Sequence, residues 1–528
     1  MPVAEGASSL LASVDWVVIG AYIGGLIVLG LAMSRRHAGP ADYFLASRAT
    51  LWPAIGLAML ASNMSSTALV GLAGGAYAIG ISVYDYEWTA TVILVFFCLF
   101  LLPLVIRSQT FTMPEFLERR YDRRVRVQFA LMSLFLIIFV DAAGVLYSGA
   151  LVCRLLFPVW PLWLIVAALA GAAGIYTTLG GLRAVIYTEA VQAIVLLAGA
   201  LMISISAFSR AGGWRAVMTG VNPSAISLIR PIGDPGVPWP GLLFGIPLLG
   251  FYYWCTNQSI VQRVLSAKNI DHARWGALFA GLLKLPVLFL IVLPGTCALL
   301  LFPQLPRADA VYPMLILRLL PAGLIGLVVA GFIASTMVSI ASMLNSASTL
   351  ITMDVVRPLR PALSERRIVR VGQASTVALL AAAVAWAPQL QWFPSLWQYL
   401  QAVLAYVVPP VVALFLCGMF WRAPTADAAS ATMLIGSLCG LLLFLSNVVF
   451  RWTHLHFLYA APLLTALDVG ILAAVSSARP HDGSRESTMW QASFGRTGNP
   501  RALPFWQDHR FLAAALLALT AAIVITFR

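Results

Sequence analysis

The sequence predicts an all-α integral membrane protein with about fourteen transmembrane helices, on three observations: its composition, its long apolar runs and the placement of its charges. Of its 528 residues, 61% are hydrophobic and 10% are charged, and the mean hydropathy is +0.90. Soluble domains average about 25% charged residues. Because a soluble domain of any size keeps a large surface in water, this composition predicts a protein that lies in a lipid bilayer.

The apolar runs define the predicted helices in chain order. A run of about 20 residues is long enough to cross the hydrocarbon core of a bilayer as a helix. Such runs lie near 14–33, 51–80, 85–106, 127–152, 159–180, 184–208, 238–262, 275–302, 311–353, 369–388, 393–421, 429–450, 456–477 and 511–527.

The net charge of +13 indicates orientation in the membrane, not a nucleic-acid partner. Most Lys and Arg residues lie in short loops that alternation of the spans brings to one face. These loops are 34–48, 107–126, 263–274, 357–370 and 479–510. The positive-inside rule makes that face cytoplasmic. An even number of spans then leaves both termini outside the cytoplasm, in a multi-pass protein of the cell (plasma or inner) membrane.

The sequence lacks the signatures of a membrane-embedded enzyme. Its six cysteines lie in or beside apolar runs and have no metal-ligand spacing. We find no HExxH motif, no paired aspartates within the spans and no Ser/His dyad. We therefore expect a protein that is not an enzyme.

Two of the apolar runs are interrupted by polar residues. The run 51–80 carries Ser, Asn and Thr residues at 62–67, and the run 238–262 carries Gly250 and then polar residues at 256–258. Broken helices free backbone carbonyls inside the membrane and often mark a transporter's binding site. The second broken run begins five spans after the first, as a five-plus-five inverted repeat requires.

This spacing predicts five parts of the chain. They are an N-terminal segment with a peripheral first span (1–50), a ten-helix transport core (51–421), two peripheral spans (422–477), a cytoplasmic linker (478–510) and a final span (511–528).

Charged residues inside spans are costly and are candidates for function. Lys284 and Glu87 could pair with each other, or both could bind hydroxyl groups of a neutral polar solute; a purely structural ion pair is the alternative. Asp141 lies in the middle of a span, and Glu189 lies in the first turns of another. An ion-pathway role stays open for both.

Hydroxyl and aromatic side chains also gather within the spans. The segment 334–349 is rich in Ser and Thr, which either pack helices closely or supply oxygen ligands for sodium. Aromatic residues crowd 251–254 and recur at Trp397 and Tyr399. Aromatic faces suit the apolar C–H faces of a sugar.

Several segments of the chain together resemble the sodium/glucose cotransporters of the sodium:solute symporter family. The segments are VPWPG at 237–241, YWCTNQ at 253–258, IVQRVLSAKN at 260–269, ASN at 61–63, GLAG at 71–74, EW at 87–88, TMPE at 112–115, IYT at 186–188 and NSAST at 345–349. The resemblance covers about residues 15 to 450. It implies the leucine-transporter-like fold, a ten-helix inverted repeat with peripheral helices before and after it.

The resemblance also implies a sugar site near the middle of the membrane. The implied hydrogen-bonding residues are Asn63, Glu87, Lys284 and Gln401; Tyr253 is the implied inner gate with Trp254 beside it, and Tyr86 and Trp397 form the outer side. Two positions depart from the family pattern, since Ala68 replaces His or Gln and Gly250 replaces Thr or Asn. Both changes remove a hydrogen-bonding side chain, so they leave the identity of the sugar open.

The resemblance implies a sodium site as well. Its ligands are the backbone carbonyls of Ala61, Met64 and Ser335 and the hydroxyl of Ser339. Val338 replaces a Ser or Thr that supplies a second hydroxyl in the family, and Glu189 replaces an Asp. Water, Thr336 or Ser342 could substitute for the lost oxygen.

The sequence therefore predicts sodium-coupled symport of a sugar, a glucose- or galactose-like hexose or a polyol, into the cell by alternating access. Its partners are the sugar, sodium and the bilayer. Val338 motivates one alternative, a proton-coupled or uncoupled carrier on the same fold. A sugar or ion sensor is the other, although the short tail carries no kinase or response domain.

Overall fold

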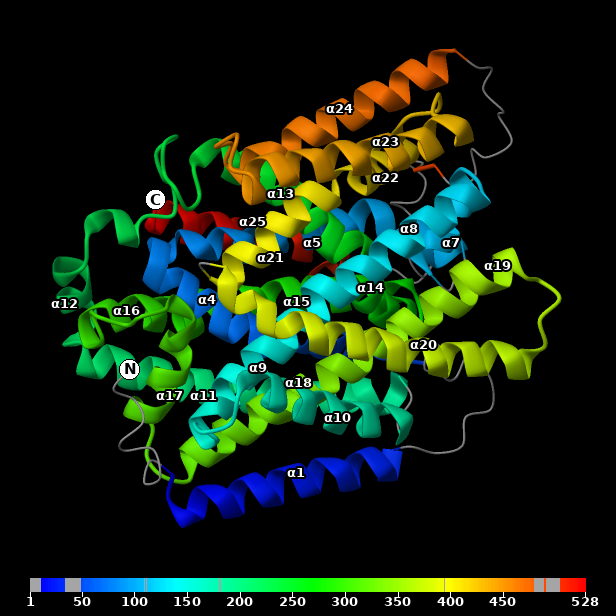
Figure 1. Cartoon of the computed structure of the whole chain (residues 1–528). Coiled ribbons are helices and arrows are strands. Elements are labelled where there is room, and N and C mark those ends of the chain that lie inside the picture. The colour runs from blue at the N-terminus through cyan, green and yellow to red at the C-terminus, as the bar shows by residue number, and fades with distance from the viewer. Residues whose placement is uncertain are drawn as a thin grey trace.

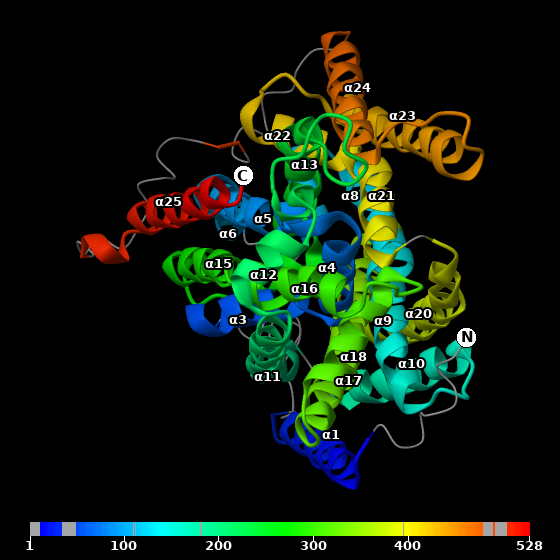
Figure 2. The same ribbon diagram turned by 90° about the vertical axis from the view of Figure 1, so that its left-hand side faces the viewer.

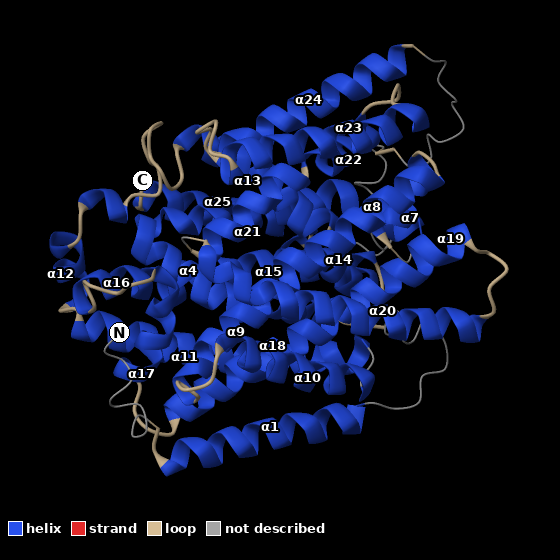
Figure 3. Ribbon diagram, in the orientation of Figure 1, coloured by secondary structure: helices blue, strands red, loops and turns tan. Residues whose placement is uncertain are grey.

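The computed structural model of the chain is a bundle of helices (Figure 1), and the residues that it describes form no β-strand (Figure 3). It describes residues 11–33, 49–108, 110, 112–179, 182–393, 395–478, 489–490 and 504–528. The predicted basic loop 34–48 and most of the predicted linker 478–510 lie outside the described residues. So does the side chain of Glu189.

The helices follow the order of the apolar runs. The first half of the bundle contains α3 (Trp52–Asn63), α4 (Ser66–Ile79), α5 (Asp85–Phe96), η4 (Phe97–Leu101), α6 (Leu102–Ser108), α7 (Met113–Arg120), α8 (Arg123–Leu136), η5 (Ile137–Ala142), α9 (Ala143–Leu156), α10 (Leu162–Leu179) and α11 (Leu182–Arg210). The second half contains η7 (Gly241–Gly245), α13 (Ile246–Phe251), η8 (Tyr252–Thr256), α14 (Gln258–Leu265), α15 (Ile270–Lys284), η9 (Leu288–Val292), α16 (Leu293–Leu301), α17 (Val311–Leu319), α18 (Leu324–Thr349), η11 (Leu350–Val356), α19 (Arg357–Leu359), α20 (Glu365–Trp386), α21 (Leu396–Val407) and α22 (Pro409–Phe420).

Further helices lie outside these two halves or connect their parts. They are α1 (Ser13–Met33), α12 (Gly213–Gly220), α23 (Ala426–Phe444), η13 (Leu445–Val449), α24 (Phe457–Ser477) and α25 (His509–Thr526), with short 3₁₀ turns at η3 (Gly80–Tyr84), η6 (Pro223–Ile226), η10 (Ala308–Ala310), η12 (Ala387–Trp392) and η16 (Phe505–Gln507). Figure 2 places α1, α24 and α25 at the edges of the bundle, around α4, α9 and α18.

The described residues contain 8 helices that are long and apolar enough to cross a membrane, or up to 10 if each bent pair counts as one span. Three shorter apolar helices add to these. The protein is therefore a multi-pass membrane protein. The number of about fourteen spans, and the division of the chain into five parts, stay predictions from hydropathy.

The first predicted interruption is a break between α3 and α4. The helix α3 ends at Asn63, Met64 takes a non-helical ψ of 45°, and Ser65 is extended before α4 begins at Ser66. The polar residues 62–67 therefore surround a gap in the helical hydrogen-bond ladder. Such a gap is tolerated at membrane depth only where the protein itself covers it.

The second predicted interruption is a break between η8 and α14. The π-helical turn η8 ends at Thr256, and Asn257 is extended, with φ −64° and ψ 121°. The Asn257 side chain caps α14 by accepting a hydrogen bond from the Ser259 backbone N–H at 2.9 Å. An Asn at this position satisfies a backbone donor that the break leaves without a helical partner.

Two further runs that the sequence suggests as single spans are broken. The run 311–353 divides into α17 and α18 at Gly323, which has a positive φ of 85°. The run 393–421 bends by 54° between α21 and α22, where Pro409 begins the second helix. Proline has no backbone N–H to continue the first helix.

Asp15 fixes α1 against the bundle. Its carboxylate oxygen Oδ1 accepts hydrogen bonds from the backbone N–H groups of Gly323 at 2.7 Å and Gly326 at 2.8 Å, at the start of α18. A Cβ atom on Gly326 would lie 2.6 Å from the Asp15 Cα, so glycine is required for this approach. The carboxylate also stabilises the positive end of the α18 dipole.

The start of α1 and the end of the chain lie at one end of the bundle, together with α12 (Figure 1). The Phe527 carbonyl accepts a hydrogen bond from the Leu228 N–H at 2.8 Å, which joins the end of α25 to the segment between α12 and η7. At the opposite end lie α7 and α19 with their arginines. That both termini lie outside the cytoplasm stays a prediction.

Trp490 of the predicted linker contacts the bundle. Its backbone N–H donates to the Met419 carbonyl at 3.1 Å, and its ring packs against Phe100 at 5.5 Å between centroids. This part of the segment is anchored, which its Ser-, Gly- and Arg-rich composition does not indicate.

Asp15→Ala should lower the midpoint of thermal unfolding in detergent, because it removes two caps of α18 and a bond from the Ala12 N–H. Loss of a helix cap costs about 1–2 kcal/mol. Val17→Ala, an exposed position on the same helix, is the control and should leave the midpoint unchanged. Equal melting of Asp15→Ala and the wild type would show that α1 is held by other contacts.

Candidate functional site

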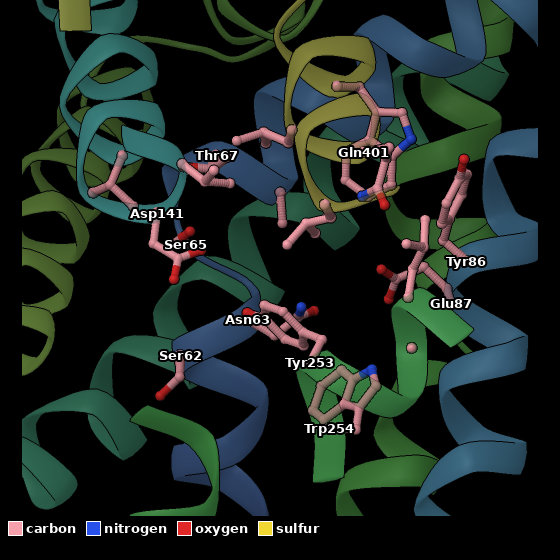
Figure 4. A pocket seen from close by; sticks show the side chains of 18 of the residues that line it. Ser62, Asn63, Ser65, Thr67, Tyr86, Glu87, Asp141, Tyr253, Trp254 and Gln401 are labelled. Carbon is pink, nitrogen blue, oxygen red and sulfur yellow. The ribbon is translucent and has the colours of Figure 1, made fainter. Parts of the chain in front are cut away.

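The predicted solute residues surround one cavity of about 100 Å³ (Figure 4). Seven of the eight line it directly: Asn63, Tyr86, Glu87, Tyr253, Trp254, Trp397 and Gln401. They come from α3, α5, η8 and α21, which are far apart in the sequence. Lys284 lies just outside the wall and contacts three of them.

The Lys284 ammonium group ties three helices together. It is fully buried at the end of α15, with its Nζ atom 2.5 Å from the Glu87 Oε2 atom and hydrogen-bonded to the Asn63 Oδ1 atom. The same Nζ atom lies 5.0 Å from the centre of the Trp254 ring, within the range of a cation–π interaction. The sequence left open whether Lys284 and Glu87 pair with each other, and the structure shows that they do.

Both charges occupy favourable helix ends. Lys284 is the last residue of α15, and Glu87 lies in the first turn of α5. Helix dipoles stabilise cations at C-termini and anions at N-termini. Gly80, with φ 78°, lies between α4 and α5 and packs so closely against η6 that a Cβ atom would lie 2.4 Å from the Ala225 carbonyl oxygen.

Aromatic rings form two walls of the cavity. Tyr253 and Trp254 pack edge to face at 5.2 Å between centroids, and Tyr86 and Trp397 do so at 5.3 Å. The Tyr253 side chain is also hydrogen-bonded to Asn63. The pairing of Tyr86 with Trp397 brings α5 and α21 together, as the resemblance implies.

The two departures from the family pattern lie at this cavity. Ala68 and Gly250 both line it and offer no hydrogen-bonding side chain. Other polar residues in the wall are Ser62, Ser65, Thr67 and Asp141. The sequence singled out Asp141 as a charge in a span but did not connect it with the solute cavity. No local motif joins it to Glu87, which lies on the other side of the cavity (Figure 4).

The predicted sodium residues lie on two elements that meet. Ala61 and Met64 are buried at the α3/α4 break, and Ser335 and Ser339 are buried on α18. The Thr336 Oγ1 atom lies 3.2 Å from the Ser66 Oγ atom, which holds α18 against the start of α4.

Both hydroxyls that the sequence suggests as substitutes for the lost oxygen have hydrogen-bond partners. Thr336 donates to the Phe332 carbonyl at 2.9 Å, and Ser342 accepts from the Arg263 Nη2 atom at 2.8 Å. Val338 is buried nearby and has no oxygen to offer.

Comparison with known proteins identifies the family. The profile of the sodium:solute symporter family matches residues 43–436. The chain belongs to the sodium:solute symporter family. This confirms the resemblance found in the sequence.

Curated members of the family are similar over most of the chain. The sodium/glucose cotransporter 4 of Danio rerio is 32% identical over an alignment of 522 positions; the alignment covers 89% of this chain and 79% of that protein. The sodium/myo-inositol cotransporter 2 of Mus musculus is 35% identical over 514 residues, 88% and 76% of the two chains. A sodium/mannose cotransporter of Bos taurus is 33% identical over 527 residues, 89% and 87%.

A solved structure shares the fold. A Na⁺-coupled sialic acid symporter in a substrate-bound outward-open state superposes with a TM-score of 0.77, covering 89% of this chain and 99% of that one. At 20% sequence identity this likeness shows the fold alone.

Breaking the buried ion pair from one side should destabilise the symporter more than removing both charges. Glu87→Gln leaves the Lys284 ammonium buried without its counter-ion, and such single changes cost about 3–5 kcal/mol. Thermal unfolding in detergent should therefore rank wild type above Glu87→Gln/Lys284→Met, and the double variant above Glu87→Gln. A double variant that melts below Glu87→Gln would contradict a charge-paired core at the cavity.

Proposed function

We propose that the protein is a sodium-coupled symporter of a sugar, a hexose or a related polyol, that works by alternating access. The observation that carries this proposal is the Lys284–Glu87–Asn63 cluster in the wall of a cavity flanked by aromatic rings. Sodium is the coupling ion of the family to which the chain belongs.

The chemistry of the cavity suits a neutral polyhydroxylated solute. A carboxylate that is paired with an ammonium group adds no net charge to the wall but still offers oxygens that accept hydrogen bonds from hydroxyl groups. Gln401 and Asn63 supply both donors and acceptors, and Tyr253 and Trp254 supply faces for C–H groups. We assign solute contacts to these residues and the sodium ion to Ala61, Met64, Ser335 and Ser339.

The two assigned sites share the α3/α4 break. Ala61 precedes the break and Met64 lies in it, while Asn63 between them faces the solute cavity. A sodium ion held there would fix the geometry of this segment and so increase the affinity for the solute, and linkage makes the effect reciprocal. We expect Tyr86 and Trp397 to close the outer side and Tyr253 the inner side in turn.

The relatives differ in their solutes, so the choice among hexoses and inositols needs a direct test. Purified protein in proteoliposomes should accumulate labelled glucose, galactose or myo-inositol when an inward sodium gradient is imposed. Equal uptake with a proton gradient or with no gradient would replace symport by the proton-coupled or uncoupled carrier. Binding without accumulation would identify a sensor.

Gln401→Ala should raise the KM for the transported sugar about tenfold, since loss of a hydrogen bond to a buried partner costs about 1–1.5 kcal/mol. Gln398→Ala is the matched control, because Gln398 lies one turn away on α21 and is exposed on a different face. The two variants are compared by initial rates of sodium-driven uptake. An unchanged KM in Gln401→Ala would remove this residue from the solute site.

A further inference from the structure

A second, smaller cavity adjoins the solute cavity. The two share Ser62, Asp141 and Tyr253 in their walls, and the smaller one also reaches Ser339 on α18. Its volume is about 20 Å³. A space of this size holds one particle as large as a water molecule.

Several oxygen-bearing side chains line the smaller cavity. The carboxylate of Asp141 and the hydroxyls of Ser62, Ser259 and Ser339 line it. The Ser259 Oγ atom is buried and has no hydrogen-bond partner within the described chain. Carboxylate and hydroxyl oxygens are hard ligands, and a buried hydroxyl without a partner indicates that a ligand completes its contacts.

Asp141 is a buried carboxylate in the middle of a span. It lies in η5 and is hydrogen-bonded to the Asn257 side chain. It forms no ion pair with any described Lys or Arg, whereas Glu87 across the solute cavity is paired with Lys284. An intramembrane carboxylate of this kind calls for a cation.

The sodium site of the family lacks an oxygen in this chain. The Val338 side chain supplies none, and the Ser342 hydroxyl already accepts a hydrogen bond from Arg263. Asp141 shares the smaller cavity with Ser339, the remaining hydroxyl of that site. A carboxylate from η5 and one hydroxyl of the family's sodium site therefore face the same small space.

We propose that Asp141 is a sodium ligand of this symporter, which holds the ion together with Ser339 and supplies the oxygen that Val338 cannot. The inference rests on the proposed function only in taking sodium as the coupling ion. It moves the ion from the family position toward η5, to the edge of the solute cavity.

Arg263 sets a limit on the affinity of this site. Its guanidinium group faces the same small cavity and donates to the Ser342 Oγ atom at 2.8 Å. A positive charge so close weakens the binding of a cation in a medium of low dielectric constant. We expect it to favour release of sodium toward the loop 263–274, which the sequence predicts to be cytoplasmic.

The test is equilibrium binding of ²²Na⁺ to the purified full-length protein in detergent, without sugar. Asp141→Asn should lower the sodium affinity about tenfold, and Val338→Ser in the Asp141→Asn background should restore most of it. Asp468→Asn is the matched control: Asp468 is a buried carboxylate within α24 that has no hydrogen-bond partner in the described chain, and it lines neither cavity. Its replacement should leave sodium binding unchanged.

Unchanged sodium affinity in Asp141→Asn would overturn the proposal. So would a variant in which only the KM for sugar changes, since Asp141 would then be a solute ligand. If Asp141→Asn does not fold, Asp141→Ser, which keeps an oxygen and removes the charge, should show an intermediate loss of affinity. Normal sodium binding in a wild-type protein that transports no sugar would sink the proposed function and leave this inference standing.

Discussion

A buried lysine in a bilayer is the constraint on which the rest of the site depends. An ammonium group without a partner at membrane depth would cost several kcal/mol. Lys284 is stable there because Glu87, Asn63 and the Trp254 ring converge on it from α5, α3 and η8. Each of these residues belongs to an element whose end or break lies at the same depth. The electrostatic requirement of one side chain thus positions three walls of the solute cavity.

Two breaks in helices also position residues at this site. The α3/α4 break gives Asn63 access to the solute cavity, and Ala61 and Met64 are buried at the same break. The break before α14 presents Asn257 to Asp141. Polar backbone is tolerated at this depth because the surrounding helices exclude lipid. One broken segment therefore contacts both the solute cavity and the proposed ion, which is the simplest physical route for coupling them.

The sequence predicted those features that have local signals. Polar residues inside apolar runs predicted both breaks, and charges within spans predicted the pairing of Lys284 with Glu87 as one of two possibilities. The cap of α18 by Asp15 and the meeting of Asp141 with Ser339 join segments about 200 to 300 residues apart, and no local pattern indicates such contacts. Hydropathy alone also does not determine the number of spans. It measures the length and polarity of an apolar run, but packing against other helices determines that the chain bends at Val408–Pro409 and divides at Gly323.

The central claim is that a neutral polyol binds against the Lys284–Glu87 pair while sodium lies beside Ser339, at the edge of the same cavity. A density map of the protein with sodium and a transported sugar bound tests it most directly. The account predicts sugar density in contact with Glu87, Asn63 and Gln401, and ion density beside Ser339. Sugar density outside this cavity, for example in the apolar groove lined by residues of α8, α21 and α23, would contradict it.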